Sequence, residues 1–361
     1  MSEKRLKLGF TAGAIDVPGS TDAELYHSML EEVEFAAGLG FDSAWMIEHH
    51  FVDYYPTPNP LVGLSHIAGR HPELELGTSV LVTPWHHPLR LAEDIAMLSQ
   101  LTDRQLHMGM GRGTAKYEYD AFGLDMSEAR ERFAETLEIV RQAFTGEKFT
   151  HSGKHFQFET PVQLRPVPDP SQISIYGAIG SSSSASIMGD AGVPPICTSV
   201  GSLEDQQAAI DTWREHAPEL AASEDLELPI MINCIVADSD KEAIAQAREH
   251  MPRFMQAQID HYQLENTDWT KVKGYEQWAN VAKNFKRLTI PENIDGWTTR
   301  QLIGSAETVK ERIDELTEIG FNHIILQCAT PGVPLESRRD WMTRFVTEVA
   351  APARRQQAAS V

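Results

Sequence analysis

The pattern of apolar and polar positions predicts a chain in which buried strands alternate with helices. Apolar runs typical of such strands occupy residues 6–13, 43–48, 75–82, 106–111, 173–179, 194–199, 229–237 and 321–328. The segments between them repeat apolar residues at helical spacing, as Leu25, Met29 and Val33 do after the first run. Eight such units favour a closed (β/α)8 TIM barrel over an open doubly wound sheet.

Two stretches interrupt this rhythm. Residues 147–170 hold two short alternating segments around a Ser-Gly turn, followed by prolines, and predict a hairpin insertion after the fourth helix. Residues 252–295 are polar, aromatic-bearing and without strand character, and predict a helical lid before the last strand-helix unit. We expect residues 1–361 to form one domain, because a barrel of this kind needs about 250 residues and accepts insertions.

Composition narrows the classes of partner. A formal net charge of −21 and a pI near 5.0 argue against nucleic acid or an anionic membrane as the main partner, since both would be repelled. Cys197, Cys234 and Cys328 are isolated, so neither a disulfide framework nor a structural zinc site is indicated. No apolar stretch approaches the length of a membrane span and no export signal is evident, so we expect a cytoplasmic protein without a membrane partner.

Candidate chemistry begins where the second strand ends, in Glu48, His49 and His50. The carboxyl ends of barrel strands form the active-site face, so three proton-handling groups at this position indicate a site. A histidine beside a carboxylate is as often a satisfied hydrogen-bonded pair, and the motif alone leaves both interpretations open.

Two further segments have the character of anion sites. The loop Gly109–Thr114 after the fourth strand combines glycines with Arg112, whose guanidinium suits a phosphate. The serine-rich residues 178–186 follow the fifth strand and open a helix, where free N–H groups favour an anion, although a flexible turn is the alternative. Phe10 and Trp85, on the first strand and after the third, are expected to line a substrate pocket.

Together these motifs resemble the bacterial-luciferase-like flavin-dependent monooxygenase family. The resemblance is carried by Gly-Phe-Asp-Ser-Ala-Trp-Met-Ile-Glu-His-His-Phe at 40–51, by Leu-Gly-Thr-Ser-Val-Leu-Val-Thr-Pro at 76–84 with its continuation at 87–94, and by the Gly-Arg-Gly loop at 111–113. It implies a (β/α)8 barrel that holds a flavin phosphate at the fourth and fifth strand ends.

The resemblance also implies roles for single residues. His49 matches the family's catalytic histidine, which could relay a proton near neutral pH with its tautomer fixed by Glu48 or a neighbouring carbonyl. The phosphate contacts it implies are Arg112, Thr114, Gly180, Ser181 and Ser184. Ser79 and Val80 match a pair behind the flavin ring that is joined by a cis peptide in the luciferases. Gly111 stands where light-emitting members carry a reactive cysteine, so light emission is not expected.

The implied reaction is oxygenation by reduced FMN and O₂ through a C4a-(hydro)peroxyflavin. The expected substrate is a small apolar aldehyde, ketone or terpenoid-like molecule. Because Thr114 replaces the third glycine of a dinucleotide fingerprint, we expect a separate flavin reductase to supply FMNH₂. The family likeness also suggests a homodimer.

Three alternatives stay open at this point. One is an F420-dependent hydride-transfer dehydrogenase of the same fold. The second is a metal-dependent barrel hydrolase that uses Glu48, His49 and His50, although strands five, six and eight end without further histidines and no metal is expected. The third is a non-catalytic flavin-binding protein.

Overall fold

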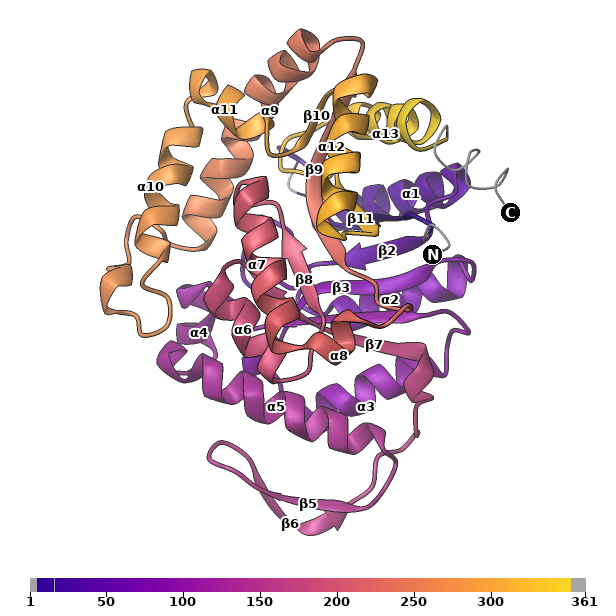
Figure 1. Cartoon of the computed structure of the whole chain (residues 1–361), viewed down its shortest axis with the longest axis vertical. Coiled ribbons are helices and arrows are strands. Elements are labelled where there is room, and N and C mark those ends of the chain that lie inside the picture. The colour runs from indigo at the N-terminus through magenta and orange to yellow at the C-terminus, as the bar shows by residue number, and fades with distance from the viewer. Residues whose placement is uncertain (1–4, 16, 352–361) are drawn as a thin grey trace.

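A closed barrel of eight parallel strands, wrapped by helices, forms the centre of the computed structural model, which describes residues 5–15 and 17–351 (Figure 1). The barrel strands are β1 (Lys7–Thr11), β2 (Ser43–Met46), β3 (Glu75–Val82), β4 (Leu106–Gly111), β7 (Ile173–Ile179), β8 (Pro195–Thr198), β9 (Pro229–Ala237) and β11 (His323–Gln327). They neighbour one another in this order, and β11 pairs back onto β1 in parallel. The predicted TIM barrel is therefore confirmed.

A helix follows each barrel strand, as the apolar periodicity predicts. The helices are α1 (Asp22–Leu39), α2 (Pro60–Arg70), α3 (Pro88–Ser99), α4 (Lys116–Ala121), α5 (Ala129–Phe144), α6 (Ser182–Asp190), α7 (Leu203–His216), α8 (Pro218–Ala221), α9 (Asp240–His261), α10 (Trp278–Leu288), α11 (Asp295–Thr298), α12 (Ala306–Ile319) and α13 (Leu335–Arg344). Among them are short additional helices such as α4 and α8. A π-helical stretch, Phe345–Ala350, continues α13. No helix in the described ranges combines the length and hydropathy of a membrane span.

Several strand boundaries differ from the predictions. The first and last strands, predicted at 6–13 and 321–328, span Lys7–Thr11 and His323–Gln327. The second strand ends at Met46, two residues earlier than expected, so that Glu48 and His49 belong to the loop that follows it. A short strand that was not predicted, β10 (Leu302–Ser305), pairs with β9 beside the barrel. It is only four residues long and runs directly into the N-cap of α12, which explains why its pattern is weak.

The first insertion is the predicted hairpin, formed by the antiparallel strands β5 (Phe149–Ser152) and β6 (Gln157–Val162). The second is helical, as predicted, but it does not begin with a break at Pro252. Helix α9 runs through this proline from Asp240 to His261. Its apolar face stays buried on both sides of Pro252, so packing outweighs the backbone hydrogen bond that proline removes. Helices α10 and α11 follow and stand at one side of the barrel (Figure 1).

Trp45 fills the interior of the barrel. A Cβ atom at Gly77 would lie 2.3 Å from the Trp45 ring and one at Gly9 would lie 2.7 Å from Nε1, so these two positions are open only to glycine. The indole N–H donates to Ser43 Oγ at 2.8 Å. Residues 9, 43, 45 and 77 therefore face inward, and alternation along each strand directs their neighbours outward to the helices.

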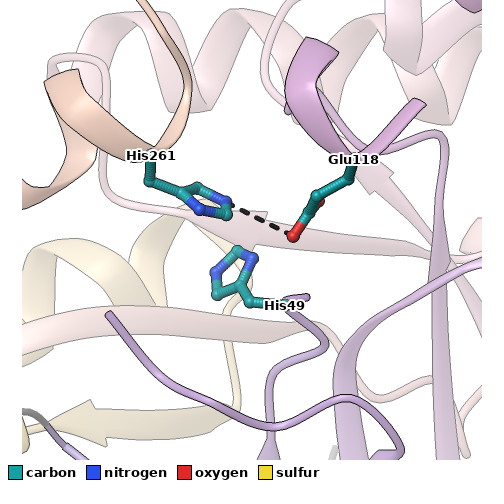
Figure 2. A group of neighbouring side chains, drawn as sticks. All are labelled: His49, Glu118 and His261. Carbon is teal, nitrogen blue, oxygen red and sulfur yellow. Dashed lines mark ion pairs between the residues drawn. The ribbon is translucent and has the colours of Figure 1, made fainter. Parts of the chain in front are cut away.

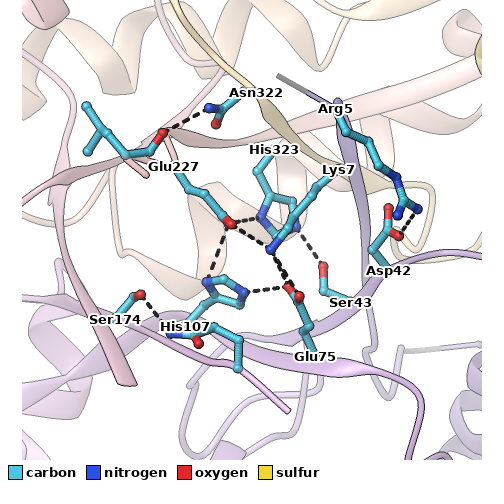
Figure 3. A network of polar contacts seen from close by, with 12 residues as sticks. Arg5, Lys7, Asp42, Ser43, Glu75, His107, Ser174, Glu227, Asn322 and His323 are labelled. Atoms are coloured by element: carbon cyan, nitrogen blue, oxygen red, sulfur yellow. Dashed lines mark hydrogen bonds and ion pairs between the residues drawn. The ribbon is translucent and has the colours of Figure 1, made fainter. Parts of the chain in front are cut away.

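A charged network closes the N-terminal end of the barrel (Figure 3). Lys7 Nζ lies 3.0 Å from a Glu75 oxygen and 2.5 Å from Glu227 Oε1. His107 Nε2 lies 2.8 Å from Glu75 Oε2, and His323 Nδ1 lies 3.2 Å from Glu227 Oε2. Each polar group has a partner, so the network connects opposite walls of the barrel. Chemistry is expected at the other end, where the strands terminate.

Candidate active site at the carboxyl ends of the strands

His49 lies in the loop after β2 and is buried, with 7% of its surface exposed. Aromatic rings surround it: the ring centroids of Tyr54, Tyr55, His261 and Tyr262 are 5.3, 6.3, 4.3 and 6.1 Å from its own. Burial, followed by the proximity of His261, holds the pKa of His49 well below its usual value. The imidazole is therefore neutral at physiological pH and can both give and accept a proton.

Glu48 does not orient His49, contrary to one of the expectations. Its carboxylate lies 3.0 Å from His50 Nε2 and 2.8 Å from His86 Nε2, and it accepts the Val82 N–H at 2.7 Å. Burial raises the pKa of Glu48, but these hydrogen bonds outweigh it and lower that pKa below its usual value. Glu48 is thus an anionic anchor between the loops after β2 and β3. The cluster Glu48, His49 and His50 that a hydrolytic metal site would need does not converge, since the Glu48 carboxylate contacts His50 and His86 and not His49.

Two side chains that were not predicted to act with His49 lie beside it (Figure 2). Glu118 comes from α4 and His261 from the end of α9, and the nearest ligand-type atoms of these two residues and His49 all lie within 4.8 Å of one another. Burial raises the pKa of Glu118 to about 8 and lowers the pKa of His261 to about 3. At neutral pH the carboxyl therefore carries a proton and the imidazole does not.

The raised pKa of Glu118 predicts a pH-dependent stability. Its carboxyl binds a proton more tightly in the folded chain than in the unfolded one, so its contribution to stability is present below pH 4.5 and is lost as pH rises through about 8. We expect Glu118→Gln to abolish this loss and to raise the unfolding free energy at pH 9 by about 1–3 kcal/mol relative to the parent chain. Thermal and urea unfolding between pH 6 and pH 9 measure the free energy of unfolding of both chains. Asp120→Asn, an exposed change on the same helix, should have the same dependence of unfolding free energy on pH as the parent chain. If the Glu118→Gln curve also runs parallel to that of the parent chain, the prediction is contradicted.

Two of the five expected phosphate residues, Arg112 and Ser184, line a cavity of about 340 Å³ between the ends of β4 and β7 and helices α5 and α6. Gly111, Arg112 and Ser184 line it together with Arg130, which the sequence did not single out. The Arg112 guanidinium stacks 4.7 Å above the Tyr275 ring, and its Nη1 donates to the Gly274 carbonyl at 3.5 Å. Arg141 and Glu138 line the cavity as well, and the Arg141 guanidinium donates to the carbonyls of Ala191 and Gly192 at 2.6 Å each. Arg112 and Arg130 are therefore the guanidinium groups that suit a phosphate dianion here.

The serine-rich segment caps α6. Ser181 is the N-cap residue, and Ser184 Oγ accepts the N–H groups of Gly180 and Ser181 at 3.1 Å each. Ser184 reaches the cavity, whereas Gly180 and Ser181 are exposed and do not line it. The Ser184 hydroxyl in turn donates to the Ser181 carbonyl at 2.8 Å. These amides and this hydroxyl are satisfied within the turn, so the positive dipole end of α6 is the feature that an anion could use here.

The third-strand pair has the geometry that the family likeness implies. The peptide bond between Ser79 and Val80 is cis. Ser79 is buried inside the barrel, with its hydroxyl 3.7 Å from Met231 Sδ. A Cβ atom at Gly111 would lie 2.5 Å from Val80 Cγ2, so a cysteine at this position would require Val80 to move. Thr114 is partly buried in the same loop.

The two predicted pocket residues differ in location. Trp85 lies at this end of the barrel, with its ring 5.2 Å from that of His50 and 5.7 Å from that of Tyr119. Phe10 is fully buried and packs against Phe41, 5.5 Å away between ring centroids, on the outer face of β1. The expectation that Phe10 lines a substrate pocket is corrected, because alternation along β1 turns residues 9 and 11 inward.

Several of the buried polar atoms that have no hydrogen-bond partner in the described ranges lie at this end of the barrel. They include Thr11 Oγ1, Trp85 Nε1, Glu118 Oε2, Asn233 Oδ1 and both ring nitrogens of His261. Unpartnered buried groups are rare in folded proteins and call for a partner. The edge of a flavin ring offers both donors and acceptors, and the arginine-lined cavity suits its phosphate, so the residues present fit a flavin nucleotide.

Comparison with known proteins shows the family. The sequence model of the family described as luciferase-like monooxygenase matches residues 8–323. An uncharacterized protein, y4vJ, of Sinorhizobium fredii is 33% identical over 151 residues, 42% of this chain and 43% of that protein, so the aligned part spans less than half of that relative. The alkanal monooxygenase alpha chain of Aliivibrio fischeri is 23% identical over 96% of this chain and 98% of its own. The oxygenase component of a flavin-dependent trigonelline monooxygenase from Acinetobacter baylyi is 25% identical over 63% of this chain and 64% of its own.

Solved structures share the fold. The monooxygenase RslO1 from Streptomyces bottropensis superposes with a TM-score of 0.79 at 23% identity, over 96% of this chain and all of that one. The oxygenating constituent of 3,6-diketocamphane monooxygenase from Pseudomonas putida, in complex with FMN, gives a TM-score of 0.72 at 20% identity, over 96% and 98% of the two chains. An F420-dependent secondary alcohol dehydrogenase gives 0.73 at 18% identity, over 96% and 99%.

Proposed function

The chain belongs to the luciferase-like monooxygenase family, and from this premise we propose that it is a monooxygenase that uses reduced FMN and O₂ to oxygenate a small apolar organic molecule, such as an aldehyde, a ketone or a terpenoid. One observation carries the proposal. The arginine-lined cavity and His49, a buried residue suited to proton transfer, lie at the same end of the barrel. An FMN that reacts at this end needs a binding site for its phosphate and a proton-transfer residue near its ring.

Arg112 and Arg130 would hold the cofactor phosphate, with Ser184 at the cavity wall and the N-terminus of α6 adding its positive dipole end. Ser79 and Val80 support the ring from the third strand. Thr114, Gly180 and Ser181 belong to the two loops that border this region and are assigned to it by family likeness. Reduced flavin, once bound, supplies the electrons that activate oxygen.

His49 moves the proton. Its neutral imidazole lies among Tyr54, Tyr55 and Tyr262, which keep water away from the ring. A proton held on one ring nitrogen of His49 can therefore be given to a reacting oxygen without competition from solvent. The aromatic residues of the lid, residues 252–295, extend this dry environment, because Trp269 and Tyr275 are buried beneath its surface. Trp85 contributes at the rim beside His50.

The remaining assignments follow from the same proposal. A separate reductase delivers FMNH₂, a division of labour consistent with the relative that is named as an oxygenase component. A homodimer is also part of the proposal and rests on the family likeness. We place the protein in the cytoplasm, where its three buried free thiols stay reduced.

We expect Arg112→Ala to weaken FMN binding about 10- to 100-fold, because the charge-assisted contacts of the guanidinium with the phosphate are lost. Arg130→Ala should have an effect of the same sign. Titration of the chain with FMN, followed by flavin fluorescence, gives the Kd. Arg90→Ala, an exposed change on α3, is the matched control. An unchanged Kd in both Arg112→Ala and Arg130→Ala would contradict the phosphate assignment.

The reaction is tested by isotope transfer. The chain, FMN and a flavin reductase are incubated under ¹⁸O₂ with a panel of aldehydes, ketones and terpenoids, and products are analysed by mass spectrometry. A monooxygenase places one ¹⁸O atom in the product. The F420 alternative, which the alcohol dehydrogenase of the same fold represents, predicts substrate oxidation with oxidised F420 or substrate reduction with reduced F420. In either case the product contains no ¹⁸O.

A further inference from the structure

The lid reaches the catalytic histidine through one side chain. His261 is the last residue of α9, and its ring meets that of His49 nearly edge-on, with centroids 4.3 Å apart and an interplanar angle of 67°. Tyr54 and Tyr262 flank the same ring at 5.4 and 4.5 Å. Figure 2 shows the two imidazoles on one side of Glu118, whose Oε1 is 3.9 Å from His261 Nε2.

His261 and Glu118 are buried with polar atoms that make no hydrogen bond. His261 is 4% exposed and Glu118 is fully buried, yet neither ring nitrogen of His261 nor Glu118 Oε2 has a partner among residues 5–15 and 17–351. Glu118 Oε1 already accepts the backbone N–H of His50 at 2.5 Å. The carboxyl proton therefore belongs on Oε2, the oxygen that is free to donate. Such unsatisfied groups lower stability and are kept where function requires them.

We propose that His261 is a positioning residue that connects Glu118 to His49 in a proton relay, and that the relay is assembled only when the lid lies on the barrel. The inference rests on the proposed function, because it assigns the source of the proton that His49 delivers. Small rotations of the Glu118 carboxyl and the His261 ring bring the three groups into hydrogen-bond contact. Since Glu118 belongs to α4 and His261 to the lid, lid closure and proton supply are coupled.

The proton balance of the relay is simple. His49 gives the proton on one ring nitrogen to an oxyanion formed in the reaction. His261 replaces it by donating the proton on one of its ring nitrogens, and its other nitrogen takes the carboxyl proton of Glu118. The relay then holds one proton fewer, as the Glu118 carboxylate, which regains a proton from water when the lid opens. No electrons move.

The surroundings suit this direction of transfer. Glu118 faces the His50 amide, Glu48, Tyr262 and His261, and burial followed by the charge of Glu48 keeps its proton bound near neutral pH. His261 faces His50, Tyr54, Tyr262, His49 and Glu118 and is neutral, so it can pass a proton without holding a stable charge. His49 faces Tyr54, Tyr55, Tyr262, His50 and His261. No lysine or arginine is among these neighbours.

Activity variants give the first test. We expect His261→Gln and Glu118→Gln each to lower kcat about 10- to 100-fold, a loss on the lower part of the scale for general acid-base groups. The double variant should be no slower than the slower single variant, because both changes break one relay. The parent kcat should fall as pH rises through about 8, where Glu118 ionises, and this alkaline limb should be absent in both variants. His250→Gln, on the same helix beside Trp341, should keep parent kcat and pH profile.

A second test uses the cofactor-free chain, so that it does not depend on the proposed function. In ¹⁵N-histidine spectra, the ring signals of His49 and His261 should shift together between pH 7 and pH 9 as Glu118 loses its proton, and neither should shift in Glu118→Gln. Uncoupled signals, or a parent-like kcat and pH profile in His261→Gln, would overturn the relay. A stoichiometric divalent cation bound by the parent chain and lost in His261→Gln would also overturn it, because a coordinated imidazole cannot pass the proton. If the parent chain transfers no oxygen to any substrate while the coupled shifts are present, the proposed function fails and the relay stands.

Discussion

Replacing His49 by alanine is expected to lower kcat by about 10²–10⁴-fold, the usual range for the loss of a general acid-base group. The imidazole lies at the barrel mouth beside Glu118 and the lid residue His261, with one ligand-type atom of each of the three residues within 4.8 Å of the others. Water cannot replace it easily, because Tyr54 and Tyr55 pack around the vacated position. Steady-state oxygen consumption with reduced FMN measures the loss.

FMN affinity should change little in the same variant, since the phosphate cavity is lined by Arg112, Arg130 and Ser184 and not by His49. This separates a chemical role from a binding role. His87→Ala removes an exposed imidazole from the neighbouring loop and should leave both kcat and affinity at parent values. Parent-like turnover in His49→Ala would rule out the proton-transfer role assigned to it.

The largest expected loss of stability follows from Arg338→Met. Arg338 and Glu32 form an ion pair between α13 and α1 in which each side chain is 2% exposed. Burial raises the pKa of Glu32 to about 7, and the charge of Arg338 opposes this rise. Removing the guanidinium leaves a buried carboxyl without its partner, which costs about 3–5 kcal/mol in the free energy of unfolding.

Urea unfolding at pH 7 measures this loss. The double variant Glu32→Gln/Arg338→Met should recover most of it, because no buried charge then remains. Arg339→Met, which removes a neighbouring and more exposed arginine from the same helix, should cost less than Arg338→Met. Equal stability of the parent and Arg338→Met, or a double variant less stable than the Arg338 single variant, would contradict the account of this pair.

The sequence could predict the parts of the fold that rest on long, bounded apolar runs. Strands β3, β4, β7 and β9 begin and end at the predicted residues, because each is a buried run with polar residues or turn formers at its edges. The same logic brings His49 and Arg112 to one end of the barrel, since parallel strands end at a common face. The sequence predicts an insertion that begins at Pro252, but helix α9 continues through this proline, because the burial of its apolar face outweighs one lost hydrogen bond.

The sequence could not predict which side chains from distant segments meet. His86, from the loop after β3, takes the carboxylate of Glu48 that local spacing assigns to His49. Arg130 reaches the phosphate cavity from α5, and Glu118 and His261 reach His49 from α4 and the lid. None of these pairings leaves a local signal in the chain. Phe10 shows the same limit at the level of one strand, because only the register of β1 in the barrel decides which of its faces turns inward.

The reaction of the bound reduced cofactor with oxygen tests the central proposal most directly. The chain is loaded with FMNH₂ without air, mixed with aerated buffer in a stopped-flow instrument and followed by absorbance, with reduced F420 as the parallel arm. We expect a transient absorbing species that requires the chain, FMNH₂ and oxygen together and that decays faster when a substrate is added. Oxidised FMN appearing at once, at the rate of free FMNH₂, or substrate turnover with F420 alone, would contradict it.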